Sequence, residues 1–111
     1  MFEKDLNMGF LLDFYGVLLS DRKRSVMDMY YNEDFSLSEI AEQIDISRQG
    51  VRDLIKKSEE ELVFYEERLG LAKKMQSVEE QTNKLHSLSK STSLPKEIHD
   101  QINVLAELMR Q

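Results

Sequence analysis

Two helix starts in the middle of the chain constrain its fold more than any other feature. Residues 36–39, Ser-Leu-Ser-Glu, form a capping box, in which a serine hydroxyl and a glutamate carboxylate satisfy free backbone N–H groups at a helix start. Ser47 is a second N-cap, and Asp45 just before it tolerates the left-handed backbone of a tight turn. The sequence therefore predicts a helix over 37–44, a turn of about three residues and a second helix from Arg48.

The apolar residues of these two helices have the spacing of a crossing pair. Ala41 is small and central in the first helix, where a close crossing needs a small side chain, and the surrounding apolar positions are Ile40, Ile44, Ile46, Val51 and Leu54. In a helix-turn-helix, the first helix braces the second so that its N-terminal part can enter a DNA major groove. The alternative is an unrelated pair of packed helices. Caps, turn and Ala41 agree in register and favour a helix-turn-helix at about 37–57.

Helical spacing before this motif predicts two more helices. The first runs over 3–19, with a buried stripe at Leu6, Phe10, Phe14, Val17 and Leu18. Ser20 is the expected N-cap of the second, whose inward residues are Val26, Met29 and Tyr30. Residues 32–35 form the break before the motif.

After the motif, we expect one long helix that continues through Gly70, because a lone glycine is tolerated in a helix. The serine-rich stretch 86–94 is interpreted as a loop or a fray point. Pro95 suits the first turn of a last helix, with one apolar stripe at Ile98, Ile102, Leu105 and Leu108. The predicted fold is all-α, with a helix-turn-helix domain over 1–70 and a helical extension over 71–111.

The long helix also predicts self-association. Its apolar positions Leu62, Tyr65, Leu69 and Ala72 begin a short, imperfect coiled-coil seam that continues at Val78, Thr82 and Leu85. The seam can pack on the last helix of the same chain or on a second chain. A head this small leaves much of a long helix uncovered, so we favour a homodimer.

Composition excludes several classes of protein. The net charge of −6, from 15 basic and 21 acidic residues, argues against a protein that coats nucleic acid non-specifically. Apolar runs are too short to span a membrane, and the N-terminus lacks the pattern of a secretion signal. The chain has no cysteine and no nucleotide-binding or catalytic motif. We therefore expect a cytoplasmic protein that is not an enzyme, with no catalytic residue, metal or cofactor.

One side of the second helix of the motif is basic and polar. Arginine can pair with guanine and glutamine with adenine, while a serine at a helix N-terminus suits a phosphate. The candidate nucleic-acid-binding residues are Ser47, Arg48, Gln49, Arg52, Lys56 and Lys57. Candidate phosphate contacts precede them at Arg22, Lys23 and Arg24. The alternative is that both groups are solvated charges on an ordinary helical surface.

The stretch 18–62 resembles region 4 of bacterial sigma factors. With FLLDFYGVLLSD before it and EEELVFYEERL after it, the chain resembles more closely the YlxM family of small Gram-positive proteins, over most of its first 70 residues. The resemblance implies a regulatory, nucleic-acid-binding role connected with the signal recognition particle, with DNA favoured over RNA. The alternative function is an adaptor that binds a protein or RNA component of that particle. Asp45 departs from the glycine that is frequent at this turn position.

Overall fold

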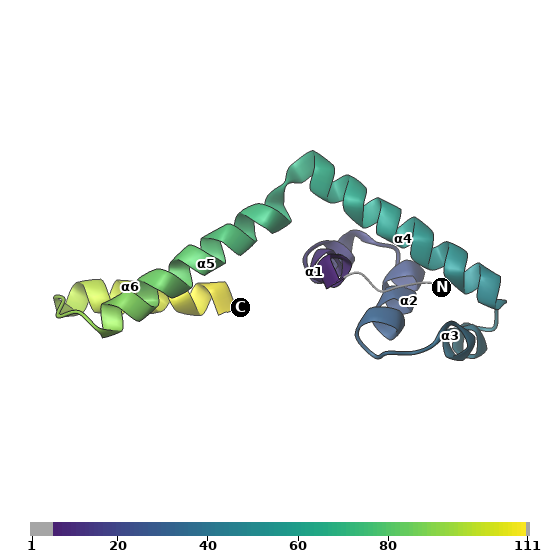
Figure 1. Cartoon of the computed structure of the whole chain (residues 1–111), viewed down its shortest axis with the longest axis horizontal. Coiled ribbons are helices and arrows are strands. Elements are labelled where there is room, and N and C mark those ends of the chain that lie inside the picture. The colour runs from purple at the N-terminus through teal and green to yellow at the C-terminus, as the bar shows by residue number, and fades with distance from the viewer. Residues whose placement is uncertain (1–5, 111) are drawn as a thin grey trace. The chain divides into compact units, whose positions relative to one another are not determined.

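The computed structural model describes residues 6–110, and the regular elements in that range are helices (Figure 1). They are α1 (Leu6–Tyr15), the 3-10 turn η1 (Gly16–Leu18), α2 (Asp21–Tyr31), α3 (Leu37–Ile44), α4 (Arg48–Leu69), α5 (Leu71–Lys90) and α6 (Lys96–Arg110). The expected all-α class is confirmed. Contacts divide the chain into two compact units, Met1–Ala72 and Lys73–Gln111, called the head and the hairpin below. Across the described range, none of the helices has the length and hydropathy needed to cross a bilayer.

The core of the head lies where α4 packs against α1, α2 and α3. Its large, fully buried aliphatic side chains come from three of these helices and are Val26, Met27, Ile40, Val51, Ile55 and Leu62. Burying a side chain of this kind stabilises the fold by about 1.5–3 kcal/mol. The core therefore fixes α4 on the other helices and holds α3 against the first turns of α4.

The first helix differs from the prediction in length and in its buried face. Helix α1 ends at Tyr15, and the chain continues as a 3-10 turn that leaves Val17 and Leu18 exposed by 67% and 52%. The buried residues are Met8, Leu12, Tyr15 and Leu19, while Phe10 and Phe14 pack at the edge of the core. The tighter turn rotates the chain out of the α-helical register, so Val17 and Leu18 leave the predicted stripe. The predicted start at Glu3 and the side chain of Leu6 lie outside the described residues.

The second helix has the predicted bounds, and its buried face includes one residue more than predicted. The Ser20 hydroxyl accepts a hydrogen bond from the Lys23 backbone N–H at 3.3 Å, which confirms the predicted N-cap. Val26 and Tyr30 are buried, and Met29 is half-buried against the core. Met27, which the spacing did not identify, is fully buried beside them.

The predicted continuation through Gly70 is wrong. Helix α4 ends at Leu69, and Gly70 adopts φ 62°, a left-handed conformation that glycine reaches without the steric cost paid by other residues. The Gly70 N–H donates to the Glu66 carbonyl oxygen at 2.8 Å and closes the helix end. The seam predicted from Leu62 onward is therefore interrupted between Leu69 and Ala72.

The predicted loop or fray point over 86–94 is wrong for residues 86–90, which are helical, while residues 91–94 lie in a connection. Helix α5 reaches Lys90, and only residues 91–95 connect it to α6. Hydroxyl groups along this helix donate to carbonyl oxygens of the preceding turn, Thr82 to Val78 and Ser89 to His86, each at 2.7 Å. Because these polar groups are satisfied within the helix, the stretch is compatible with helical structure.

The last helix begins directly after Pro95, close to the predicted start, but its buried face differs from the predicted stripe. The Pro95 carbonyl oxygen accepts hydrogen bonds from the N–H groups of Ile98 and His99, at 3.1 and 3.2 Å. Ile102 and Ala106 are buried, whereas Ile98, Leu105 and Leu108 are exposed. Sequence spacing did not separate the small, buried Ala106 from the neighbouring Leu105 and Leu108, which are exposed.

Candidate nucleic-acid interface

The turn between α3 and α4 has the local chemistry that the sequence predicts. The Ser36 hydroxyl accepts from the Glu39 N–H at 3.1 Å, and the Ser36 N–H donates to Glu39 Oε1 at 2.9 Å. Asp45 closes α3 in the left-handed conformation, with φ 56° and ψ 50°. Two hydrogen bonds lower the pKa of Glu39. The one from the Ser36 backbone N–H has the larger effect, and the one with the Ser36 hydroxyl has the smaller. Glu39 is therefore a carboxylate at neutral pH, close to the start of the motif.

The turn packs closely against Gly50, in the first turn of α4. The Ser47 hydroxyl accepts from the Gly50 N–H at 3.0 Å, as expected of an N-cap. A Cβ atom at position 50 would lie 3.2 Å from Ser47 Oγ and 3.3 Å from Ile46 Cδ1. Gly50 thus lets the turn residues lie directly on the first turn of α4, where the backbone N–H groups point outward.

Three predicted base-reading residues lie together on the exposed side of this first turn. Arg48, Gln49 and Arg52 line one shallow hollow of about 290 Å³, which Leu37 at the start of α3 completes. Gln49 Nε2 donates to Asp53 Oδ1 at 3.0 Å, so one of its amide hydrogens is held along the helix. The hollow combines two guanidinium groups, an amide and an apolar wall. These groups can recognise the edges of bases in a major groove.

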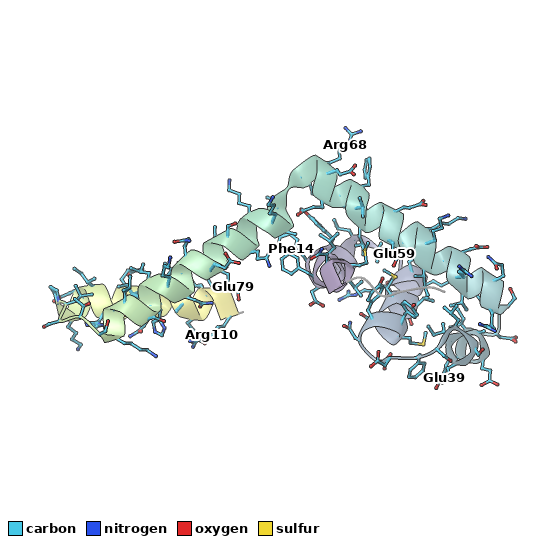
Figure 2. The ribbon with its side chains drawn as sticks, viewed as in Figure 1. Phe14, Glu39, Glu59, Arg68, Glu79 and Arg110 are labelled. Carbon is cyan, nitrogen blue, oxygen red and sulfur yellow. The ribbon has the colours of Figure 1, made fainter. Side chains whose placement is uncertain are left out.

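The predicted lysine contacts lie further along α4, outside this hollow. Lys56 and Lys57 are exposed. Lys56 borders a second surface depression of about 520 Å³ that lies entirely on α4, whose other lining residues are Glu59, Glu60, Val63, Phe64 and Glu67. Figure 2 marks Glu59 and Arg68 on this part of α4, with Glu39 on α3. The basic part of α4 therefore ends near Lys57. The surface that follows has the apolar Val63 and Phe64 at its centre and glutamates around them, and we call it the acidic ridge.

The basic triplet of α2 does not act as a single unit. Lys23 Nζ forms an ion pair with Glu61 Oε1 at 3.2 Å, and both side chains are about 30% exposed. Arg22 and Arg24 are exposed on the same turn. An ion pair with this exposure contributes little stability, roughly 0–1 kcal/mol, but it neutralises the Lys23 charge. Of the three candidate phosphate contacts, Arg22 and Arg24 keep their charge available.

The motif as a whole is electrically balanced. Residues 37–57 contain four basic and four acidic residues, and the acidic ones include Asp45 and Asp53 at the two ends of the first α4 turns. Long-range attraction toward a polyanion is consequently weak. Binding to nucleic acid at this surface would depend on short-range contacts of the arginines.

The four predicted self-association residues have different surroundings. Leu62 and Ala72 are fully buried in the core of their own chain, and Tyr65 is half-buried against it. Leu69 is 52% exposed. Leu62 and Ala72 therefore cannot contact a second chain. Ala72 is buried because the break at Gly70 turns it into the head.

Sequence reasoning missed a hydrogen-bonded cluster that holds the break. The Tyr15 hydroxyl donates to Glu66 Oε1 at 2.7 Å and accepts from the N–H groups of Leu71 and Ala72 at 3.2 and 3.3 Å. The Ala72 N–H also lies 3.1 Å from Glu66 Oε1. These contacts cap the start of α5. The contacts of Tyr15 join residues more than 50 positions apart, so no local pattern could have identified them.

A capped pair of crossing helices, joined by a tight turn and braced by two further helices, defines a helix-turn-helix protein. Comparison with known sequences agrees: residues 2–107 match the family described as "Putative helix-turn-helix protein, YlxM / p13 like". The chain belongs to this family. It is 45% identical to the YlxM protein of Bacillus subtilis over 106 residues, which cover 96% of each chain.

Two further relatives are similar over most of their length. A Caldanaerobacter subterraneus protein is 52% identical over 80 residues, or 72% of this chain and 68% of the relative. A Listeria welshimeri protein is 40% identical over 109 residues, or 97% of this chain and 99% of the relative. Both are named for the same family. The match therefore includes the last forty residues, whose resemblance was less clear from the sequence alone.

Proposed function

We propose that this protein is a regulator that binds nucleic acid, with duplex DNA as the preferred ligand, through the N-terminal part of α4. The observation that carries the proposal is the grouping of Arg48, Gln49 and Arg52 around one exposed hollow at the start of the second helix of a helix-turn-helix. This is the part of such a motif that enters a major groove. The proposed role is binding in the cytoplasm and includes no catalytic step.

Each residue has a role that follows from its chemistry. Arg48 and Arg52 present planar guanidinium groups that can bond a guanine with two hydrogen bonds. Gln49 can pair with adenine after exchanging its hydrogen bond with Asp53. The remaining groups contact the backbone: Ser47 and the helix N-terminus bind one phosphate, Lys56 and Lys57 follow the strand, and Arg22 and Arg24 reach a phosphate from α2.

Fluorescence anisotropy of the full-length protein on mixed genomic duplex fragments, at several salt concentrations, tests the proposal. We expect saturable binding with a steep salt dependence, since each phosphate contact contributes a slope of about −0.9 to the log–log plot. Arg48→Ala/Arg52→Ala should weaken binding by at least about 10-fold, because one good base contact is worth about 1–3 kcal/mol. Lys84→Ala/Lys90→Ala removes the same charge from the hairpin and is the matched control. Equal loss in both variants would show that only total charge matters and would refute the assignment.

A second function is favoured by the acidic ridge of α4. Val63 and Phe64 are 37% and 49% exposed between glutamates, and Arg68 lies over the Phe64 ring at 5.1 Å. A surface of this kind suits a basic, amphipathic protein segment. Under this alternative, the protein is an adaptor for a component of the signal recognition particle, the machinery that the family resemblance implies.

Purified components of that particle distinguish the two functions. If the adaptor function holds, Val63→Ala/Phe64→Ala should abolish binding to a protein component while Arg48→Ala/Arg52→Ala leaves it intact. Binding to the particle's RNA alone, lost on removal of the arginines, would instead assign the arginine surface to RNA. Duplex binding that survives Val63→Ala/Phe64→Ala supports the regulator.

The regulator proposal also includes a homodimer. Many helix-turn-helix proteins bind two half-sites with two recognition helices, so a second copy would supply the second α4 N-terminus. Of the four residues first predicted for this contact, Leu62 and Ala72 are buried in the head. A homodimer therefore requires another surface, such as the part of the seam beyond the break at Gly70.

A further inference from the structure

The hairpin of α5 and α6 buries little apolar surface of its own. Within the described part of Lys73–Gln111, the buried hydrophobic residues are Ile102 and Ala106, and the other buried side chains are the polar Thr82 and Ser89. Units of about 40 residues rarely obtain enough stability from a single small core. One large aliphatic side chain is far below what two helices need, so the hairpin requires a partner surface.

The hairpin meanwhile exposes many large apolar side chains. Each of the following is between 38% and 59% exposed: Met75, Val78, Leu85, Leu88, Ile98, Val104, Leu105 and Leu108. Soluble monomers seldom leave so many large apolar residues in water on so small a unit. Such a surface indicates an interaction site.

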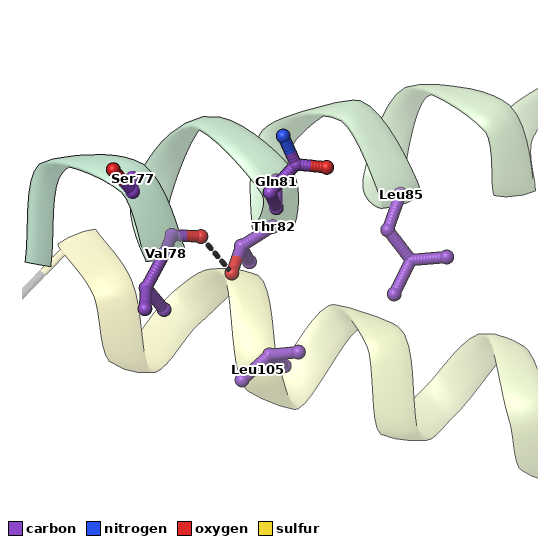
Figure 3. Close-up of a pocket in the computed structure, with 6 residues that line it drawn as sticks. All are labelled: Ser77, Val78, Gln81, Thr82, Leu85 and Leu105. Carbon is purple, nitrogen blue, oxygen red and sulfur yellow. Dashed lines mark hydrogen bonds between the residues drawn. The ribbon is translucent and has the colours of Figure 1, made fainter. Parts of the chain in front are cut away.

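Several of these residues share one face. Val78 and Leu85 are seven residues apart on α5, and Ile98 and Leu105 are seven apart on α6, so each pair lies on one side of its helix. Val78, Leu85 and Leu105 line one hollow of about 380 Å³, together with Ser77, Gln81 and Thr82. In Figure 3, Val78 and Leu85 extend from α5 toward α6, where Leu105 lies. We define Val78, Leu85, Ile98 and Leu105 as the apolar face.

A polar contact outside this hollow also links α5 to α6. His86 Nε2 and Asn103 Oδ1 are 3.0 Å apart, and neither residue lines the hollow. The apolar face therefore borders a pair of helices that are already linked, and it is open to a partner.

We propose that the apolar face binds the same face of a second copy of this chain, so that two hairpins form a four-helix bundle. The inference builds on the homodimer of the proposed function and does not depend on nucleic-acid binding. In a two-fold symmetric pair, each apolar residue faces the same apolar set on the other chain. Four helices then enclose the core that two cannot provide.

The charge of the hairpin favours a second copy over a charged partner. Residues 73–111 contain six basic and five acidic residues, whereas residues 1–72 contain nine and sixteen. Two hairpins can therefore approach without net repulsion, and the mixed charges around the apolar face can pair across the interface. A nucleic acid or a strongly charged protein would find no complementary charge here.

The size of the face is sufficient for a dimer. Helix α5 has 20 residues and α6 has 15. At 1.5 Å per residue, α5 is about 30 Å long and α6 about 22 Å, and each is about 10 Å wide, so the pair presents on the order of 500 Å² per copy. Two copies then bury about 1,000 Å², which is about the smallest area expected of a specific interface.

Analytical ultracentrifugation of the full-length chain over a concentration series tests this inference. We expect the parent at tens of micromolar to have twice the 13.1 kDa mass of one chain. Leu85→Glu/Leu105→Glu should raise the dimer dissociation constant by about 100-fold or more, because each charge would be buried in an apolar interface. Val104→Glu is the matched control, since Val104 is 51% exposed on α6 but lies outside the hollow.

Each outcome is decisive. Dissociation in the double variant alone, with helix content unchanged by circular dichroism, supports the inference. A monomeric parent refutes both the homodimer and this interface, while a dimer that survives Leu85→Glu/Leu105→Glu refutes the interface alone. Equal dissociation in Val104→Glu would also refute it.

If the glutamate variant loses helix content, Leu85→Ala/Leu105→Ala serves instead and should weaken the dimer by at least about 10-fold. Anisotropy on duplex DNA is measured separately, so a failure of nucleic-acid binding leaves these masses unaffected.

Discussion

The Tyr15 hydroxyl, at the end of α1, donates a 2.7 Å hydrogen bond to Glu66 Oε1, near the end of α4. The same hydroxyl accepts from the first two backbone N–H groups of α5, so one buried side chain links three helices. Tyr15 is only 2% exposed. This contact fixes the place where α4 ends and α5 begins.

Removal of this hydroxyl should destabilise the head. Tyr15→Phe removes the hydrogen bond of the Leu71 N–H to this hydroxyl and leaves the Ala72 N–H with Glu66 alone, and the loss of these hydrogen bonds should cost about 1–3 kcal/mol. Urea denaturation should show a loss of this size, with faster amide hydrogen exchange at Leu71 and Ala72. Tyr65→Phe, which changes a half-buried tyrosine of α4, is the control and should cost less. Similar losses in the two variants would contradict the role of Tyr15.

The stability of the head should fall at high pH. Burial, and then the hydrogen bond to Glu66, raise the pKa of Tyr15 above its ordinary value. Because the folded state holds this proton more tightly than the unfolded chain, the stabilisation is complete below the ordinary tyrosine pKa of about 10 and is lost as the pH rises toward the folded pKa. Phenolate absorbance of the parent, compared with Tyr15→Phe, should show that Tyr15 ionises late. Ionisation of Tyr15 at the ordinary tyrosine pKa would contradict this prediction.

The same substitution at two glycines should have opposite effects. Gly70 has φ 62°, whereas Gly9 lies within α1, and a Cβ atom at either position would meet no atom within 4 Å. Gly70→Ala should cost about 1–2 kcal/mol, because alanine is strained in the left-handed conformation. Gly9→Ala should stabilise by about 0.5–1 kcal/mol through helix propensity. Thermal unfolding measures both, and a stabilising Gly70→Ala would show that the break is not conformationally required.

Replacing Asp45 by glycine should improve both stability and binding. Asp45 is left-handed, with φ 56°, and it adds negative charge at the turn before Arg48. Asp45→Gly should remove backbone strain of up to about 1 kcal/mol and tighten duplex binding a few-fold at low salt. Asp34→Gly is the control: Asp34 has φ 57° but lies in the connection before α3. Tighter binding in both variants would show that the effect comes from net charge and not from the position of Asp45.

The parts of the fold that depend on neighbouring residues were predictable from the sequence. The capping box of Ser36 and Glu39, the left-handed Asp45 and the Ser47 cap each rest on side chains within four residues of the backbone groups that they satisfy. Their agreement in register located the helix-turn-helix and its exposed arginines. The side on which Arg48, Gln49 and Arg52 meet followed from helical spacing alone.

The features that depend on distant residues were not predictable in this way. Gly70 is compatible with a continuous helix by propensity, and the break is held by Tyr15, which is 55 positions away in the sequence. The ion pair of Lys23 with Glu61 spans 38 positions. The buried face of α6 depends on which side of α5 it meets, so Ile102 and Ala106 could not be separated from Leu105 by spacing.

The balance of four acidic and four basic residues in 37–57 has a consequence for how such a regulator would behave in a cell. Because the acidic residues offset the long-range attraction of the basic ones, the motif is held only briefly on random sequence, so most molecules would be free and not sliding along the chromosome. Occupancy of a target would then follow the number of protein copies almost directly. Few copies of such a regulator would be bound at non-specific sites elsewhere in the genome.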